Sequence, residues 1–225
     1  MSWKTWQRDH NILIPAKDWG RALALVNETR IANEIKWISF SIFYRTCWTG
    51  VKQAASSKEL DDAYCGLCNS AIEQDTMHKY FLCSVTKTLW YNLQNFVYYN
   101  FNTYMSKNVN TIMFHQIDNK SKEDKIRISS LISTAKFCIW KISNSTLDPN
   151  LPGKIIWNKF SLYLSIVADS HIKLFHDLEF WYKIRYSLTN WIPENFPENI
   201  DIRRNTERDH ENWRYQMNRY AINQD

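Results

Sequence analysis

Four side chains that commonly bind metal ions lie close together in the sequence: Cys65, Cys68, His78 and Cys83. Two residues separate Cys65 from Cys68, so both thiolates can reach one ion from a tight turn that Gly66 makes easier to form. His78 and Cys83 begin about one helical turn apart, close enough to complete a tetrahedron. Zinc favours sulfur and imidazole ligands, and four protein ligands are typical of structural rather than catalytic zinc. The spacing therefore predicts a structural zinc site.

Other roles for the cysteines are open at this point. All five could be ordinary buried thiols, and a lone Cys-x2-Cys could be a redox pair. A redox pair usually lies between a strand and a helix in a thioredoxin-like pattern, which the sequence around Cys65 does not show. Cys47 and Cys138 lie in apolar helical patterns, and we expect both to be core thiols.

Two carboxylates, Glu73 and Asp75, lie between the two ligand pairs. Carboxylates are harder ligands than a thiolate-rich site prefers, so we do not expect them to bind the ion. We expect them to face water or to accept a hydrogen bond from His78 that fixes its ring.

A second pattern surrounds the ligands. It consists of an acid–threonine pair just before the histidine, an aromatic residue between the histidine and the last cysteine, and a tryptophan further on: Asp75-Thr76, Phe81 and Trp90. Together with residues 43–52, this pattern resembles the zinc-binding domain found downstream of the reverse transcriptase in non-LTR retrotransposon polyproteins. The resemblance is specific over residues 36–100 and looser through the predicted helix that ends at residues 139–141. It implies contact with template RNA or target DNA beside an upstream reverse transcriptase module, although nothing in this chain resembles that polymerase.

The composition indicates an ordered, globular and helical chain, because 44% of the residues are apolar and 15% are aromatic. The net charge of +5 permits contact with phosphate but does not demand it. Zinc with three thiolates carries a net charge of about −1, so nearby cations partly offset the site itself. Five basic side chains flank the ligands in sequence and are the predicted nucleic-acid contacts: Arg45, Lys52, Lys58, Lys79 and Lys87.

We expect neither a secretory signal nor a transmembrane span. The first residues lack the apolar run of a secretory signal. The longest uncharged segment, 88–106, contains several amide side chains that would be costly to bury in lipid. Cysteines without framework spacing suit a reducing compartment. The sequence thus predicts an intracellular protein of the nucleus or cytoplasm.

The predicted fold class is mainly α, a helical domain with an embedded Cys3His zinc knuckle. Apolar spacing predicts a helix that starts at Asp18, breaks near Asn33 and resumes to Trp48, where Thr49-Gly50 ends it. A further helix is predicted over 85–96. Ser121 caps the clearest helix, whose apolar positions recur at three and four: Ile128, Leu131, Ile132, Ala135, Ile139 and Ile142. Two more helices, over 156–167 and 178–191, follow a break at 148–153.

These elements predict four segments. They are an N-terminal helical lead-in (1–35), a zinc-binding domain (36–106), a C-terminal helical subdomain (107–192) and a polar tail (193–225). Residues 1–15 are expected to be loosely held. Residues 98–104 interleave tyrosines with amides, which could hold unpaired bases, but few cations accompany them. We expect these tyrosines to cap the core instead.

No catalytic constellation is evident. The chain lacks a polymerase carboxylate pair, a P-loop, Gly-x-Ser-x-Gly and His-Glu-x-x-His. Asp148-Pro149 and Pro193-Glu194 do not make a convincing endonuclease motif. His115, His171 and His176 are isolated, and we expect satisfied surface or boundary histidines. The predicted function is a non-catalytic, zinc-stabilised module that binds RNA or DNA; the alternative is a zinc-stapled protein-interaction or structural domain.

Overall fold

The computed structural model describes residues 3–10, 12, 14–59, 63–68, 70–143, 152–173 and 177–190. The described chain is mainly helical and embeds the four predicted ligands, so the predicted fold class is confirmed. It divides into two compact units, residues 1–163 and 164–225, and α8 contains the boundary. The four predicted segments and their limits stay predictions.

In chain order the elements are α1 (Trp3–His10), α2 (Ala16–Glu28), α3 (Asn33–Phe43), α4 (Gly50–Ser57), β1 (Tyr64–Cys65), β2 (Ser70–Glu73), the π-helix η2 (His78–Leu82), α5 (Ser84–Phe101), α6 (Val109–Phe114), α7 (Lys122–Ser143), α8 (Pro152–Lys173) and α9 (Leu178–Asn190).

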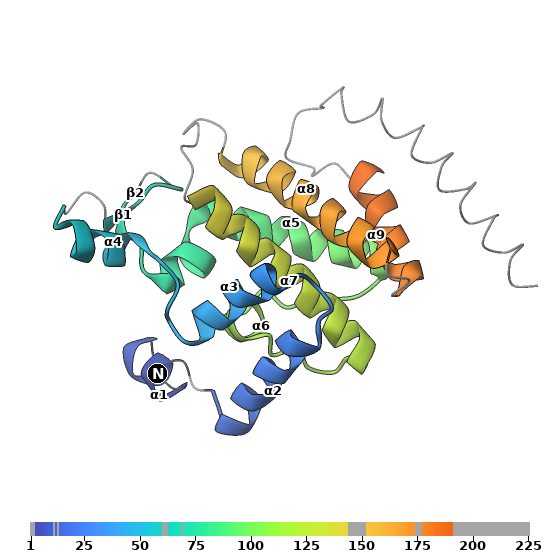
Figure 1. Ribbon diagram of the computed structural model, residues 1–225, viewed down its shortest axis with the longest axis horizontal. Helices are drawn as coiled ribbons and strands as arrows, with labels where there is room; N and C mark the ends of the chain where they lie inside the picture. The colour runs from blue at the N-terminus through green and yellow to red at the C-terminus, as the bar shows by residue number, and fades with distance from the viewer. Residues whose placement is uncertain are drawn as a thin grey trace, which may run out of the picture. The chain divides into compact units, whose positions relative to one another are not determined.

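Helix α7 is the core of the first unit. Figure 1 shows it crossing the middle of that unit, where it packs against α2 and α3. All six apolar positions predicted for its inner stripe are buried, and the Ser121 hydroxyl accepts a hydrogen bond from the Asp124 N–H at its start (3.0 Å). Burial extends around the whole helix from Ile128 to Ile139. A helix buried on every side lies within a core rather than on its surface.

Small polar residues let the central helices approach one another. The hydroxyls of Ser39 on α3 and Ser133 on α7 lie 3.1 Å apart and are both buried. The hydroxyls of Ser130 and Thr134 donate hydrogen bonds to backbone carbonyls one turn earlier in α7, those of Ile126 and Ser130. A buried hydroxyl is costly unless it is paired, so these contacts make the short side chains acceptable in the core.

The N-terminal segment is held more firmly than the sequence predicts. Residues 3–10 form α1, and the Trp6 side chain is fully buried. Its indole N–H donates to the Phe43 carbonyl (2.9 Å), and its ring packs edge-on against Phe114 (centroids 5.0 Å). The expectation of a loose lead-in was therefore wrong over this stretch, because one buried tryptophan anchors α1 to α3 and α6.

The predicted helix to Trp48 ends earlier, at Phe43. Arg45 adopts a left-handed backbone conformation (φ 55°), which a continuing α-helix does not tolerate. Thr49-Gly50 does not stop a helix, as predicted from the glycine, but starts α4 with Thr49 at its N-cap position. The predicted break at 148–153 and the tail 193–225 lie wholly or largely outside the described residues, and Pro152-Gly153 begin α8.

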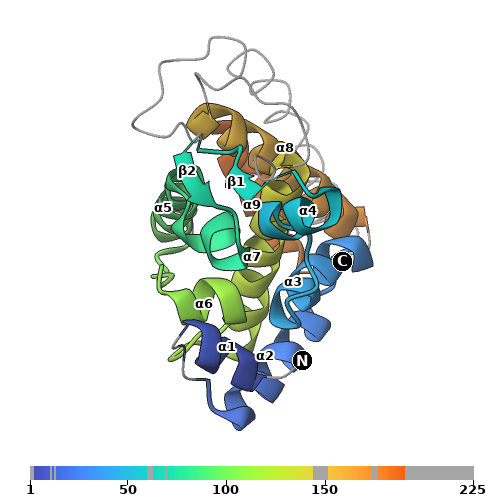
Figure 2. The same cartoon turned by 90° about the vertical axis from the view of Figure 1, so that its left-hand side faces the viewer.

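The predicted zinc segment forms a small module on the helical body. β1 pairs antiparallel with β2 (Tyr64 with Glu73, Cys65 with Ser70), and α4 packs against β1. Figures 1 and 2 both place β1, β2 and α4 together, away from α2. η2 contacts α5, α6 and α7, so it connects the module to the core.

The second unit contains the last turns of α8 and the helix α9. His171 stacks on Trp181 (ring centroids 4.2 Å apart, planes at 11°). Arg185 on α9 pairs with Asp169 on α8 (3.1 Å) and donates to the Ser165 hydroxyl. A search of the described helices for a long apolar stretch that could cross a bilayer found none.

Candidate metal centre

The structure brings the four predicted ligands into one cluster. Cys65 ends β1, Cys68 lies in the turn after it, His78 begins η2 and Cys83 directly precedes α5. One ligand atom from each residue lies within 4.8 Å of every other. The Sγ atoms of Cys65 and Cys83 are 3.9 Å apart, and Cys68 Sγ lies 3.4 Å from His78 Nε2.

These separations match the edges of a zinc tetrahedron. With Zn–S bonds of about 2.3 Å and Zn–N bonds of about 2.0 Å, tetrahedral angles put two sulfurs about 3.8 Å apart and a sulfur and nitrogen about 3.5 Å apart. Cys65, His78 and Cys83 are buried and Cys68 is half-buried. Four protein ligands in a mostly enclosed site fit a structural zinc ion, which would take all four as its coordination shell.

A π-helical turn explains the His-x4-Cys spacing. In an α-helix, five residues rotate the chain by about 500°, which leaves the first and last side chains about 140° apart. In η2 the Cys83 N–H instead donates to the His78 carbonyl (2.8 Å), an i→i−5 bond that widens the turn. This wider turn brings His78 and Cys83 to the same side, so the geometry depends on a local departure from α-helix.

Asp75 fixes the start of this turn. Its carboxylate accepts a hydrogen bond from the His78 backbone N–H at 2.6 Å, as an N-terminal cap does. Glu73 is exposed on β2, as expected, whereas Asp75 accepts its hydrogen bond from the His78 backbone and not from the ring.

Polar side chains also contact the sulfurs. The Gln74 amide donates to Cys65 Sγ (3.5 Å), and the Ser70 hydroxyl lies 2.8 Å from Cys68 Sγ. A hydrogen bond joins the Cys65 and Cys83 thiols; this contact lowers the pKa of Cys65 and raises the pKa of Cys83. Two thiols that share a proton in this way lose the first proton easily and the second with difficulty. A divalent cation between them removes that difficulty, because metal binding needs both as thiolates.

Lys79 was among the predicted nucleic-acid contacts, but the structure places it inside the module. Its side chain is buried, and its ammonium donates to the Trp48 carbonyl (3.0 Å). Burial lowers the pKa of Lys79 to about 8, while the negative charge of Cys47 and Cys65 acts in the opposite direction. The side chain has no route to a ligand in solvent in this conformation. Its positive charge instead lies in the field of the thiolates.

The other four predicted contacts differ in their surroundings. Lys58, which ends α4, and Lys87 on α5 are exposed. Arg45 pairs with Asp9, and Lys52 donates to the carbonyls of Arg45 and Cys47. The structure thus brings Arg45 and Lys52 together as parts of the framework and leaves Lys58 and Lys87 with free access to solvent.

The remaining cysteines and histidines lie apart from the cluster. Cys47 and Cys138 are buried, as predicted; Cys47 Sγ contacts the Thr76 hydroxyl (3.4 Å), and Cys138 contacts the Ile156 carbonyl. His115 is buried rather than at a surface, and its Nδ1 lies 2.8 Å from the Ser129 hydroxyl. His171 is also buried, and His176 lies outside the described residues. Within the described part of the chain, the Cys3His set is the one group with metal-binding geometry.

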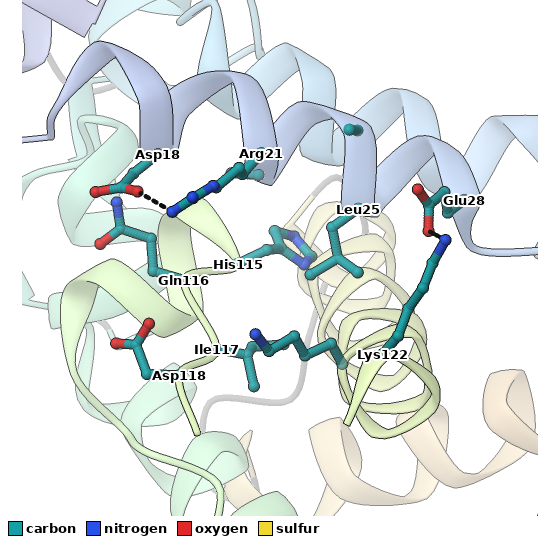
Figure 3. Close-up of a pocket in the computed structure, with 12 residues that line it drawn as sticks. Asp18, Arg21, Leu25, Glu28, His115, Gln116, Ile117, Asp118 and Lys122 are labelled. Atoms are coloured by element: carbon teal, nitrogen blue, oxygen red, sulfur yellow. Dashed lines mark hydrogen bonds and ion pairs between the residues drawn. The ribbon is translucent and has the colours of Figure 1, made fainter. Parts of the chain in front are cut away.

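A pocket of about 600 Å³ lies between α2 and the segment that leads into α7 (Figure 3). Part of its charged rim is paired, since Asp18 binds Arg21 (3.2 Å) and Glu28 binds Lys122 (3.1 Å). The His115 ring on its wall is held by Ser129 and by Lys136, whose Nζ lies 2.8 Å from Nε2. Because these charges are paired and the imidazole is tethered, we assign no chemistry to this pocket.

Comparisons of the chain with protein-family models, with curated proteins and with solved structures found no match. The description of the protein therefore rests on its fold and on the Cys3His cluster. It is a mainly helical protein with a Cys3His group whose geometry can hold a metal ion such as zinc.

Proposed function

We propose that the chain is a non-catalytic, zinc-stabilised module that binds RNA or DNA, related to the zinc-binding domain that follows the reverse transcriptase in non-LTR retrotransposon polyproteins. The observation that carries this proposal is the closed Cys3His cluster. With four protein ligands, the zinc ion keeps no open position for a substrate or an activated water. Its role is then to fix the placement of the surrounding surface.

The residues that carry the family resemblance have physical roles beside this cluster. Asp75 caps the ligand-bearing turn, and Thr76 contacts the Cys47 thiol. The Trp90 indole N–H donates to the Tyr80 carbonyl inside η2 (2.8 Å), which joins α5 to the turn that carries two ligands. The pattern therefore behaves as one structural unit, which supports descent from that family more than a chance spacing of cysteines would.

The charge supports a polyanionic partner. The protein carries a net charge of +5, and two predicted contacts, Lys58 and Lys87, are exposed on elements that flank the cluster. Lys79 offsets part of the negative charge of a zinc–thiolate centre from within, so these outer lysines remain available for phosphate.

Fluorescence anisotropy with labelled structured RNA, single strands and duplex DNA tests the proposal. We expect affinity to fall steeply with salt, because phosphate contacts release counterions. A Lys58→Glu, Lys87→Glu double variant should bind more weakly and keep its zinc. Lys141→Glu, which changes an exposed lysine on α7, is the matched control. An affinity that does not respond to salt, or no binding below roughly 100 μM for any nucleic acid, would contradict the proposal.

A second candidate is a zinc-stapled protein-interaction domain. Apolar side chains are exposed on several elements of the zinc module: Trp48, Tyr64, Ile72 and Leu82. Exposed apolar groups on one module are typical of protein docking surfaces. Salt-insensitive association with a protein partner that Ile72→Asp abolishes, in a chain that binds no nucleic acid, would favour this candidate. An open reading frame for a reverse transcriptase directly upstream would favour the first.

A further inference from the structure

Exposed tyrosines lie on the outer face of α5 and on the segment that follows it. The exposed fractions are 45% for Tyr91, 52% for Tyr98, 66% for Tyr99 and 63% for Tyr104. Buried positions on α5, such as Leu89, Leu93 and Phe96, fill the core instead. The expectation that the tyrosines of residues 98–104 cap the core was therefore wrong, since all three are exposed.

Helical spacing aligns part of this group with a lysine. Lys87, Tyr91 and Tyr98 recur at intervals of four and seven, which places them on one side of α5. Tyr91 and Tyr98 are about 10 Å apart along the axis. That distance equals about three steps of a stacked strand at about 3.4 Å each.

The chain that follows α5 folds back along the helix and completes the face. Asn102 ends α5 in a left-handed conformation (φ 47°). The buried Gln94 amide then donates to the Met105 carbonyl (2.8 Å), which fixes the returning segment beside the helix. Lys107 consequently reaches Tyr91, with its ammonium 4.7 Å from the ring centroid. The returning segment also carries Tyr104.

The face has the charge that a polyanion requires. The sequence contains no Asp or Glu from Thr76 to Ile117, whereas Lys87 and Lys107 lie at the tyrosines. The helix dipole favours negative charge at the start of α5, near Lys87, and disfavours it at the end, near Tyr98 and Tyr99.

We propose that the outer face of α5 and its returning segment, formed by Lys87, Tyr91, Tyr98, Tyr99, Tyr104 and Lys107, bind single-stranded nucleic acid by stacking its bases on the tyrosines. Each base has a π-face, so stacking needs unpaired bases but no particular sequence. A duplex keeps its bases stacked on one another and cannot use this surface in the same way. The inference rests on the proposed function, for which it names the surface and the strandedness of the ligand.

The metal cluster and this face are connected through the chain. α5 begins at Ser84, directly after the ligand Cys83, and Trp90 binds back to η2. A bound zinc ion thus sets the angle at which α5 leaves the module. Single-strand binding should weaken when the metal is removed, even though none of the six surface residues is a ligand.

The experiment compares zinc-loaded full-length variants by anisotropy with a single strand and a duplex of equal length. Tyr98→Leu with Tyr99→Leu removes two rings, whereas Tyr98→Phe with Tyr99→Phe retains them. Tyr186→Leu, an exposed tyrosine on α9, is the control. Loss of stacking weakens binding by about 5- to 100-fold for each base concerned. We expect a loss of at least about 10-fold on the single strand for the Leu pair and a change of less than about 2-fold for the Phe pair and the control.

Salt dependence separates the two kinds of contact. The Leu pair should weaken binding at every salt concentration with the same slope, because tyrosines release no counterions. Lys87→Gln and Lys107→Gln should each lower the salt slope by about 1. Unchanged zinc content and circular dichroism establish that each variant is folded.

The possible failures differ for the two proposals. Binding of single strands that is equally tight in the Leu pair, or binding of duplex alone, overturns this inference and leaves the proposed function intact. No binding of any nucleic acid by the wild type overturns both. Weakening that the Phe pair shares with the Leu pair overturns stacking, since it would assign the contact to the hydroxyl groups.

Discussion

Replacing Lys136 with Met should flatten the pH dependence of stability in the range below the ordinary lysine pKa of about 10.4. The Lys136 side chain is fully buried in α7, where its Nζ donates to the Met113 carbonyl (2.9 Å) and lies 2.8 Å from His115 Nε2. Burial lowers the pKa of Lys136 well below its ordinary value, and the negative charge of Cys47 opposes this shift. Burial therefore disfavours the charged form of this amine in the folded protein.

The sign and size of the effect follow from proton linkage. In the unfolded chain Lys136 holds its proton up to a pKa of about 10.4. Between the lowered folded pKa and that value the unfolded state binds one more proton than the folded state, so stability rises with pH by about 1.4 kcal/mol per unit. A methionine has no proton to bind and cannot contribute this slope. The Lys136→Met variant also removes the donor to the Met113 carbonyl, which costs about 1–3 kcal/mol at any pH. The test is therefore the slope with pH and not the stability at one pH.

Urea unfolding of the zinc-loaded protein at several pH values measures this slope. Burial raises the pKa of Cys47 and of Cys138, but both thiols are present in wild type and variant, so their contribution cancels in the comparison. Burial and the Lys136 charge lower the pKa of His115, whose effect falls in the acid range below about pH 6.5, where stability declines as the unfolded imidazole takes up protons. Lys141→Met on the exposed side of α7 is the control and should keep the wild-type slope. Parallel curves for wild type and Lys136→Met would refute the reasoning, because they would mean that the buried amine stays charged.

Three further predictions concern the metal module and the N-terminal anchor. Cys83→Ser should abolish stoichiometric zinc binding. Hydrogen exchange should then rise more in residues 84–89 than in residues 131–139, because α5 starts at the ligand and α7 belongs to the core; equal protection in both segments would contradict this. Trp90→Phe should cost about 1–3 kcal/mol in urea unfolding because the buried Tyr80 carbonyl loses its donor, whereas Trp37→Phe on the surface should cost less than about 0.5 kcal/mol. Trp6→Ala should cost about 3–5 kcal/mol and expose α1 to limited proteolysis; a cost within 1 kcal/mol of zero would mean that α1 is not anchored.

The parts of the structure that the sequence predicts are those with a strong local signal. Ligand types and spacing predict the cluster of Cys65, Cys68, His78 and Cys83, since few other arrangements use three thiols and an imidazole so close together. The apolar period predicts the inner stripe of α7, and the Ser121 cap predicts its start. Both signals depend on residues within a few positions of one another, so no knowledge of the tertiary fold is needed.

The parts that could not be predicted depend on partners distant in sequence. Trp6 anchors α1 only because the fold brings the Phe43 carbonyl and the Phe114 ring into contact with its indole. The sequence predicts Lys79 to be a surface cation, yet its ammonium donates to the Trp48 carbonyl inside the protein. The tyrosines of α5 face solvent because other residues of that helix already fill the core.

The candidate site also contains one local feature that spacing alone signals in retrospect. Four residues lie between His78 and Cys83, and this five-position step is incompatible with one face of an α-helix but fits a π-turn. Gly50 is the opposite case. Glycine commonly follows a helix, but here it opens α4, because Thr49 occupies the N-cap position and the previous helix has already ended at Phe43.

X-ray absorption at the zinc edge, combined with native mass spectrometry of the purified, unchelated chain, tests the central claim most directly. The account predicts one zinc ion per chain, with three sulfurs at about 2.3 Å and one nitrogen at about 2.0 Å. A purified chain that holds no zinc, or a zinc ion that binds water or oxygen in place of one of the four side chains, would contradict it.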